Sequence, residues 1–559
     1  MRRAPRIVFA ASTLLYLVTG TFLTAGRGDL MGDALSRVSA TESALFSRDP
    51  HLSAIGFVFT PLTSLAQLPF VALSQWFPAI TRWGLSGVLM TALFMAGAVT
   101  MIWGIGVDRG APQWLCVLIT AAFALNPMIV FYGGNGMSEA LFGCCLCWAV
   151  RRLMRWVRTD GVHDLAAAGI ALGLAYLTRY DALAPAAVAG LAVYGFSYRR
   201  RTEQRFAGAA MDLVLLVAPV ALAFLVWAAT SWLITGQAFQ QFTSQYGNSA
   251  ILEQSGAVRP DHPIAAAQYS FAAMLILAPT LPLLLPLAAA LGVRRRDWQP
   301  AVPILLFGAV LGFQTLTYVT GSTFAFLRFY IAAIPLTAIL ALLIAPARGC
   351  PPSRRLGRYA EVDRNATEHV AVEAVSATAR RGRPVVGAGA AAVLLLVSLP
   401  VTALGMNSQI MAVQEYPLGA VLFPDPDNVS DKYADQVRIA ATFSTERRLA
   451  DYLDALELPP GSIVLDTVYG FAVLAASERP ERFVIPSDRD FVRILNRPAE
   501  RGAKYILAVP NTGRGTSDAV NRRYPTMYEN GAQIATLELE IPNDGAGQPN
   551  WRLYRVIGS

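Results

Sequence analysis

Charged residues are scarce in this sequence. Only 15% of its 559 residues are Asp, Glu, Lys or Arg, whereas 54% are hydrophobic. Soluble domains typically carry about 25% charged residues, and disordered chains have low hydrophobicity. The shortage of charge therefore excludes both a string of soluble domains and an intrinsically disordered chain. What remains is a membrane protein with several spans and some soluble mass attached.

Cysteine, histidine and lysine are also rare. The five cysteines lie in or beside apolar runs, so no disulfide framework is indicated. The four histidines are too scattered to form a metal cluster by spacing. The net charge of +8 comes almost entirely from arginine, because Lys432 and Lys504 are the only lysines. This excess does not indicate nucleic-acid binding, since the cytoplasmic loops of membrane proteins collect basic residues.

Long apolar runs supply the membrane spans. Runs near the ~20 residues that cross a bilayer begin near residues 7, 84, 113, 138, 207, 264, 301, 326 and 384, and a shorter pair covers 165–178 and 182–198. Residues 54–78 are also apolar, but Pro61, Pro69 and Pro78 interrupt helical hydrogen bonding. Placing this segment in the interface gives eleven spans, with 23 arginines in cytoplasmic loops and seven outside. If the segment were a span, seven arginines would lie in cytoplasmic loops and 23 outside. The positive-inside rule disfavours that topology.

This threading predicts four regions with the N-terminus in the cytoplasm. They are a transmembrane module over 1–346, a cytoplasmic linker loop over 347–383, a last transmembrane helix over 384–404 and an extracytoplasmic domain over 405–559. In the tail, strand-like runs at 462–466, 482–485 and 504–510 alternate with helical patterns near 443–456, 470–477 and 488–497. This alternation is typical of a small α/β domain. The glycine-rich stretch 511–516 is either a phosphate cradle or, as is commoner, a loop and helix cap.

Polar residues of interest gather in the outer loops of this threading. The first loop holds Asp29, Asp33, Arg37 and His51 between the first span and the apolar segment 54–78. A partly desolvated carboxylate there can act as a general base, and an arginine can bind a phosphate through paired hydrogen bonds. The alternative is a solvated loop in which the aspartates only cap the next helix.

Three further outer sites show the same ambiguity. Their polar residues are Tyr132, Asn135 and Glu139 before one span, Arg179 and Asp181 between the short pair of spans, and Arg328 and Tyr330 at the start of another. Acids at the mouth of a span are costly and often functional, but a helix N-terminus also favours them. One alternative is that Arg179 and Asp181 pair only to stabilise a turn. Another is that Arg328 only anchors its span at the membrane–water interface.

The order of these motifs resembles that of the bacterial GT-C glycosyltransferases. An acid in the first outer loop precedes a proline-containing apolar segment, then Asn126-Pro127 and Met137-Ser138-Glu139. The stretches 173–179 and 327–330 are similar to those of the RgtA/B/C/D-like branch, which is related to the protein mannosyltransferases and aminoarabinose transferases. The resemblance covers about residues 7–346. It implies a polytopic α-helical enzyme that uses a polyprenyl-phosphate sugar donor on the outer face.

The resemblance also assigns roles. It implies Asp33 as the catalytic base, with Asp29 second, and matches Glu139 to the acid of the second outer loop. The arginines expected to bind the donor phosphate are Arg328, Arg179 and Arg37. The candidate donor or acceptor contacts are His51, Tyr132, Asn135, Asp181 and Tyr330. Many relatives carry two adjacent acids in the first loop, whereas Ala34 follows Asp33, which argues against a divalent metal.

The expected function is therefore an inverting hexosyl- or pentosyltransferase in the bacterial plasma membrane. Its partners would be the lipid-linked donor, the bilayer and a glycan, lipid or protein acceptor of the cell envelope. A lipid or glycolipid transporter or flippase is the first alternative, although such proteins usually show inverted repeats and charges at the membrane midplane. A non-catalytic scaffold with an outer binding domain is the second, and it would tolerate the loss of Asp33.

Overall fold

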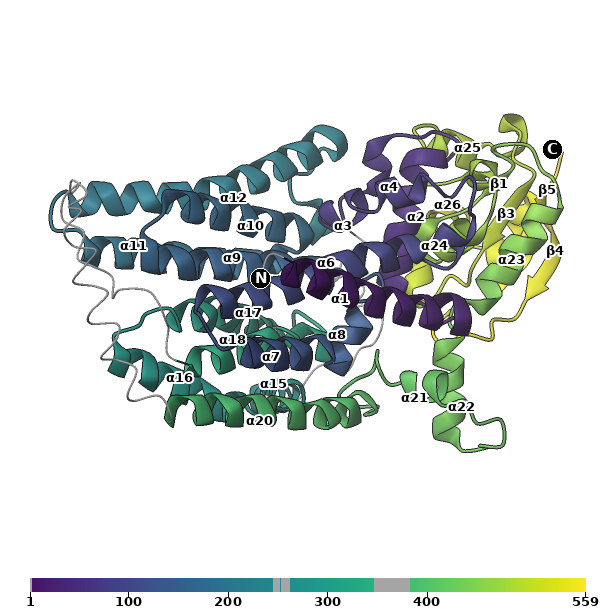
Figure 1. Cartoon of the computed structure of the whole chain (residues 1–559). Coiled ribbons are helices and arrows are strands. Elements are labelled where there is room, and N and C mark those ends of the chain that lie inside the picture. The colour runs from purple at the N-terminus through teal and green to yellow at the C-terminus, as the bar shows by residue number, and fades with distance from the viewer. Residues whose placement is uncertain (1–2, 245–251, 253–261, 346–382, 559) are drawn as a thin grey trace.

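Long helices run side by side in one body, and a small sheet lies beyond one end of them (Figure 1). The computed structural model describes residues 3–244, 252, 262–345 and 383–558. The predicted linker loop 347–383 lies outside the described residues except for its last residue. The helices of the body are α1 (Ala4–Thr21), α6 (Leu85–Asp108), α7 (Gln113–Ala124), α8 (Pro127–Tyr132), α9 (Glu139–Thr159), α10 (Val162–Thr178), α11 (Leu183–Arg200), α12 (Arg205–Thr235), α15 (Pro263–Leu277), α16 (Leu281–Arg295), α17 (Ala301–Val319), α18 (Ala333–Ile344) and α20 (Arg383–Met406).

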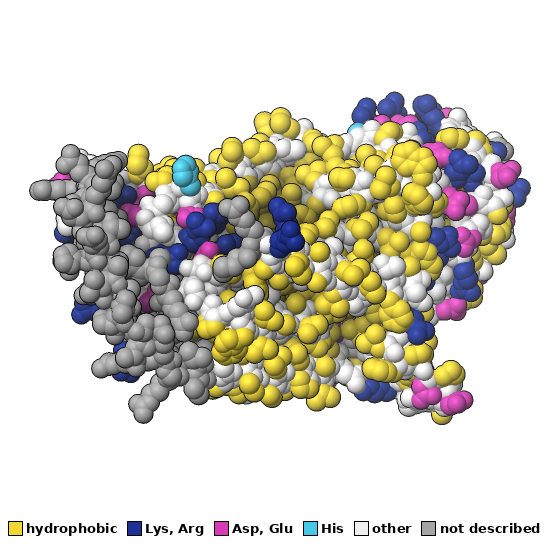
Figure 2. Space-filling view, viewed as in Figure 1, with side chains coloured by type: hydrophobic (Ala, Val, Ile, Leu, Met, Phe, Trp, Pro, Cys, Tyr) yellow, Lys and Arg dark blue, Asp and Glu magenta, His cyan; other side chains and the backbone are white. Residues whose placement is uncertain are grey.

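The surface of this body is that of a membrane protein. Figure 2 shows a broad hydrophobic band over the helices, while charged side chains crowd the sheet end. Among the described residues, six helical stretches are long and apolar enough to cross a bilayer, or seven if α15 and α16 form one bent span. The predicted total of eleven stays a prediction, because α7 and α10 are short and α9 carries four arginines.

The predicted single span near residue 264 is two helices. The axes of α15 and α16 differ by 81°. Pro279 lies in the break between them, where its ring and missing N–H prevent a continuous helix.

Residues 54–78 form no long helix. The segment contains only the end of a 3-10 turn, η2 (Leu52–Ile55), and the short helices α3 (Leu62–Leu65) and α4 (Leu68–Val71), and α5 (Ala79–Arg82) follows it. These turns pack against α2 (Gly32–Phe46), the helix of the first outer loop. The prolines therefore break the apolar run as expected, and the run covers one side of α2.

The C-terminal region contains a five-stranded sheet in the order β2-β1-β3-β5-β4. The three predicted runs form the parallel strands β1 (Ile463–Val464), β2 (Phe483–Val484) and β3 (Tyr505–Ala508). The predicted helices are α23 (Ser444–Ala455), α24 (Thr467–Ala476) and α25 (Phe491–Asn496). The sequence interpretation missed the antiparallel strands β4 (Ala535–Ile541) and β5 (Trp551–Val556), which extend the sheet beyond β3.

The sheet region packs directly on the first outer loop. Leu30 and Leu35, which flank Asp33, form an apolar cluster with Ala472 and Ala475 of α24 and with Phe443. Ion pairs reinforce this contact: Arg48 binds Asp488 and Asp490, and Arg82 binds Asp451 at 2.6 Å. The first outer loop is therefore held between the helical body and the sheet.

Candidate active site

Helix α2 presents Asp33 and Arg37 to the same space. The two residues are one helical turn apart, so their side chains share a face. Arg37 donates a hydrogen bond to the Asp33 carbonyl oxygen at 3.0 Å, and its guanidinium covers the ring of Phe59 in the 54–78 segment. Neither Asp29 nor Asp33 caps α2, whose N-cap residue is Met31 without a side-chain hydrogen bond. The alternative of two capping aspartates is therefore wrong.

A glycine-rich turn between α8 and α9 brings Glu139 to this space. A Cβ atom on Gly134 would lie 2.8 Å from the Gly20 Cα of α1, so only glycine allows this approach. Gly136 has φ +78°, and a Cβ there would lie 3.0 Å from the Ala34 Cβ. The turn therefore presses α1 and the start of α2 against the first residue of α9, which is Glu139.

The break between α10 and α11 supplies Arg179 and Asp181. Arg179 binds Asp181 at 3.1 Å and Glu139 at 2.9 Å, and it donates to the Ser138 hydroxyl at 3.5 Å. Gln314 of α17 donates to the Oδ2 atom of Asp181 at 2.7 Å, an oxygen that Arg179 also binds. The predicted Arg179–Asp181 pair thus exists, but it also reaches Glu139 from a separate part of the chain.

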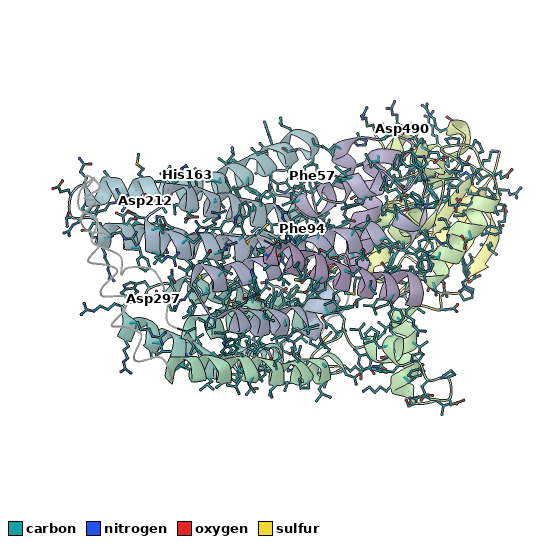
Figure 3. The ribbon with its side chains drawn as sticks, in the orientation of Figure 1. Phe57, Phe94, His163, Asp212, Asp297 and Asp490 are labelled. Atoms are coloured by element: carbon teal, nitrogen blue, oxygen red, sulfur yellow. The ribbon has the colours of Figure 1, made fainter. Side chains whose placement is uncertain are left out.

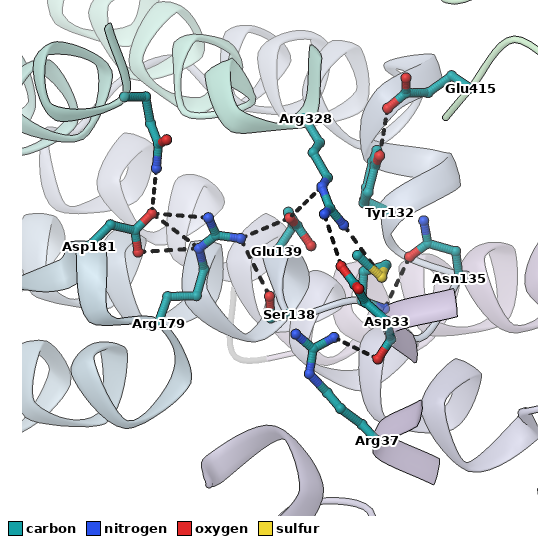
Figure 4. A network of polar contacts seen from close by, with 12 residues as sticks. Asp33, Arg37, Tyr132, Asn135, Ser138, Glu139, Arg179, Asp181, Arg328 and Glu415 are labelled. Carbon is teal, nitrogen blue, oxygen red and sulfur yellow. Dashed lines mark hydrogen bonds and ion pairs between the residues drawn. The ribbon is translucent and has the colours of Figure 1, made fainter. Parts of the chain in front are cut away.

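Arg328 joins the two halves of the network (Figure 4). It lies in η4 (Leu327–Tyr330), a 3-10 turn before α18. Its guanidinium binds the Asp33 carboxylate at 2.9 Å and lies 3.7 Å from Glu139. Phe326 and Phe329 flank it at 5.1 and 5.3 Å from their ring centroids. The Arg328 side chain is only 6% exposed, so it acts in this site and not as a solvent-facing interface anchor.

Asp33 is the most accessible acid of the network. Its side chain is 42% exposed, whereas that of Glu139 is 2% exposed. Burial alone would raise the pKa of Asp33, but the nearby guanidinium groups of Arg328 and Arg37 outweigh this effect. The pKa of Asp33 therefore lies below its ordinary value, and Asp33 is a carboxylate at neutral pH.

Several buried polar atoms of the network have no hydrogen-bond partner among the described residues. They include the Nε atoms of Arg37 and Arg328 and the Oε2 atom of Glu139. An apolar hollow is lined at its polar end by Glu139, Arg179, Asp181 and Arg328. Leaving such groups unpaired is costly, so free donors beside a hollow are typical of a site for an anionic ligand.

Glu415 is a site residue that the sequence interpretation missed. It lies after α20, and its carboxylate accepts a hydrogen bond from the Tyr132 hydroxyl at 2.5 Å. Burial raises the pKa of Glu415 to about 7, against the opposing effects of Tyr132 and Arg328. No motif surrounds Glu415 in the sequence, and its partner Tyr132 is 283 positions away. Only the folded chain therefore reveals the pair.

Four predicted residues lie outside the central network. The carboxyl of Asp29 is buried, makes no hydrogen bond or ion pair with the described residues, and has its pKa raised to about 7 by burial. His51 bonds to the carbonyl oxygen of Asp49, and the Tyr330 hydroxyl bonds to Ser270. Asn135 accepts a bond from the backbone of Met137, whose sulfur contacts Arg328 at 3.6 Å. Asn135 thus supports the turn beside the site.

The donor set of the network does not suit a divalent metal. Asp33 and Glu139 both face Arg328, and Asp181 is bound by Arg179. In the part of the chain that the structure describes, no group of three or more His, Cys, Asp or Glu residues could hold a metal ion. Carboxylates paired with arginine have little capacity left for a hard cation.

Comparisons with known proteins bear on the fold. No protein-family model matches the sequence, and no curated protein matches it. Two crystal structures of ArnT from Cupriavidus metallidurans, one bound to undecaprenyl phosphate and one in the apo state, each match with TM-score 0.55. The structure with undecaprenyl phosphate is 14% identical in sequence to this chain, and the match covers 100% of this chain and 99% of that one. The apo structure is 13% identical, and the match covers 99% of this chain and 97% of that one.

An oligosaccharyltransferase from Archaeoglobus fulgidus matches 90% of this chain and 70% of its own with TM-score 0.40 and 12% identity. These neighbours are membrane glycosyltransferases of the GT-C superfamily. At these identities the ArnT likeness concerns the fold. The chain is a membrane protein with the GT-C fold, as the sequence resemblance predicted.

Proposed function

We propose that the protein is an inverting glycosyltransferase. It moves a hexose or pentose from a polyprenyl-phosphate donor to a glycan, lipid or protein of the cell envelope on the outer face of the membrane. One observation carries the proposal: an accessible, ionised carboxylate, Asp33, lies 2.9 Å from a buried arginine, Arg328, whose Nε atom has no hydrogen-bond partner among the described residues. A general base and a phosphate-binding cation are thus held side by side.

The donor phosphate binds at the arginines. Arg328 and Arg37 each have an Nε–H group without a hydrogen-bond partner among the described residues, and Arg179 lines the same hollow as Arg328. A guanidinium matches two phosphate oxygens at once, which fixes the position of the leaving group. The shared fold with ArnT, which was crystallised with undecaprenyl phosphate, supports a lipid phosphate as this ligand.

The chemistry follows from this placement. Asp33 accepts the proton of an acceptor hydroxyl while that oxygen attacks the anomeric carbon from the side opposite the phosphate. The new glycosidic C–O bond forms as the bond from the anomeric carbon to the phosphate oxygen breaks. The electron pair leaves on the polyprenyl phosphate, whose growing charge Arg328 and Arg179 stabilise. A single displacement of this kind inverts the anomeric centre.

Glu139 and Asp181 position the arginines. Glu139 lies between Arg179 and Arg328, at 2.9 and 3.7 Å, and Asp181 binds Arg179 from the other side. Their negative charges offset the cost of burying two guanidinium groups. The apolar 54–78 segment packs on α2 and forms a wall beside Asp33 and Arg37.

An Asp33→Asn variant tests the proposal. The amide keeps the shape of the side chain but cannot accept a proton, so we expect at least a ~100-fold loss of transfer, the usual range for a lost general base. A deletion strain complemented with wild type or variant would be profiled for envelope glycans and lipids by mass spectrometry. Asp49→Asn, in the same loop but bonded to Arg489, is the matched control.

The same profiles separate the alternatives. A scaffold would tolerate Asp33→Asn at normal protein levels. A flippase would change the sidedness of a lipid without any new glycosidic bond. Either result would contradict the proposed transfer reaction.

A further inference from the structure

The C-terminal sheet directs its ligand-binding edge at Asp33. In the parallel part of the sheet β1 lies between β2 and β3, so the chain runs from β1 to β2 on one side and from β3 to β4 on the other. Open α/β sheets bind ligands at such a switch point, outside the carboxyl ends of the strands. Here the carboxyl end of β1 leads into α24, and that of β3 leads into the glycine-rich stretch 511–516.

The glycine-rich stretch is rigid and holds an arginine. The Asn521 amide donates to the carbonyl oxygens of Val509 and Gly515 at 3.0 and 2.9 Å, which clamps both ends of the loop. A Cβ atom on Gly515 would lie 2.0 Å from the Pro510 carbonyl oxygen, so the loop is tightly closed. The loop therefore fixes the backbone of Arg514 before any ligand arrives.

Through its guanidinium, Arg514 contacts α24, the helix of the C-terminal region that packs on α2. Its side chain is half-buried and lies over the ring of Tyr469 in α24, 5.3 Å from the ring centroid. Within the described residues it makes no ion pair and no side-chain hydrogen bond. Tyr469 is three residues before Ala472, which packs on the first outer loop, so Arg514 lies on the side of α24 that meets α2. Its positive charge also adds to the lowering of the Asp33 pKa.

We propose that Arg514 and Tyr469 bind an anionic group of the sugar acceptor, a phosphate or a carboxylate, and so place the attacking hydroxyl beside Asp33. This inference rests on the proposed function. Arg328, Arg37 and Arg179 belong to the helical body and its first outer loop, whereas Arg514 approaches Asp33 from the sheet side. The donor phosphate and the acceptor anion thus lie on different sides of the catalytic carboxylate.

The test uses the full-length protein in nanodiscs. Polyprenyl-linked sugars extracted from a deletion strain serve as donor, and the solubilised envelope fraction of that strain is titrated as acceptor. The variants are Arg514→Ala and Arg514→Lys. Arg501→Ala is the matched control, because Arg501 is exposed just before β3, at the opposite edge of the sheet. A second measurement records the affinity of each variant for undecaprenyl phosphate.

We expect Arg514→Ala to raise the half-saturating amount of acceptor by about 10- to 100-fold, the usual effect of losing hydrogen bonds to a charged group. The affinity for undecaprenyl phosphate should stay unchanged, Arg514→Lys should restore part of the loss, and Arg501→Ala should match wild type. Weakened undecaprenyl phosphate binding in Arg514→Ala would place Arg514 on the donor and overturn the inference.

The two proposals fail in distinguishable ways. Normal acceptor dependence in Arg514→Ala, with active wild type, would overturn this inference alone. The absence of any transfer by wild type would overturn the proposed function and the inference with it.

Discussion

At the scale of single residues, Arg328 controls the ionisation of Asp33, the proposed catalytic base. It is buried, contacts Asp33 directly, and lies within 3.7 Å of Glu139. Its positive charge therefore has two effects under the proposed mechanism. It binds the departing phosphate, and it keeps Asp33 ionised while the acceptor hydroxyl approaches.

Replacing Arg328 with Gln should move the acid limb of the pH–rate profile. The pKa of Asp33 lies below its ordinary value because Arg328 and Arg37 outweigh its burial. Without Arg328 the pKa of Asp33 rises, so the base becomes protonated at a higher pH and the rate begins to fall there. Transfer rates measured from pH 4 to 8 should show this shift besides a lower maximum. An acid limb at the wild-type pH would contradict the role of Arg328 in ionising Asp33.

Glu415 should make stability depend on pH. Burial raises its pKa from 4.5 to about 7, so the folded protein holds this proton more tightly than the unfolded chain. The stability linked to this proton is fully present below about pH 4.5 and is lost as the pH rises through about 7, by about 3 kcal/mol in total.

A Glu415→Gln variant stays neutral at every pH and so provides the comparison. Melting temperatures of the purified proteins at pH 5 and pH 8.5 measure the effect. The melting temperature of the variant minus that of wild type should be larger at pH 8.5 than at pH 5. A constant difference across this range would show that the Glu415 carboxyl does not titrate as described.

At the scale of elements, the turn between α8 and α9 sets the position of the site. Gly134 contacts the backbone of Gly20 in α1, and Gly136 lies against Ala34 beside Asp33. Ala34 directly follows Asp33, and its close contact with the turn leaves room only for a small residue there.

A Gly134→Ala variant tests this packing. The added Cβ would lie 2.8 Å from backbone atoms of α1, so α1 and the turn must separate. We expect a lower melting temperature and at least a ~10-fold loss of transfer, because a displacement near 1 Å can cost 100-fold in rate. Gly195→Ala in α11 is the control, since a Cβ there meets nothing within 4 Å. Equal behaviour of the two variants would contradict the proposed constraint.

The sequence predicted the elements better than their contacts. Hydrophobic runs located most long helices, and the first outer loop was singled out for Asp33 and Arg37. The contacts of Arg328 with Asp33 and Glu139 join distant segments, so no local pattern reveals them. The same holds for Glu415 and Arg514, which reach the site only because the C-terminal region folds back on the first outer loop. The order of motifs still selected the residues that the structure brings together.

At the scale of the whole molecule, the site lies where the helical body meets the sheet. Asp212 and Asp297 mark the far end of the body, whereas Asp490, just before α25, lies at the sheet end (Figure 3). Under the predicted topology the far end faces the cytoplasm and the sheet lies outside. The site then sits at the outer membrane surface, where a lipid phosphate and an envelope acceptor can meet.

The most direct test of the central claim follows the polyprenyl phosphate that the reaction must release. Purified protein in nanodiscs would receive the extracted lipid-linked donor and the envelope acceptor, and free polyprenyl phosphate and glycosylated product would be quantified together. The account predicts that the two appear in equal amounts, with inversion at the anomeric carbon, and that Asp33→Asn lowers both at least ~100-fold. Product formed without release of polyprenyl phosphate, or undiminished release by Asp33→Asn, would contradict it.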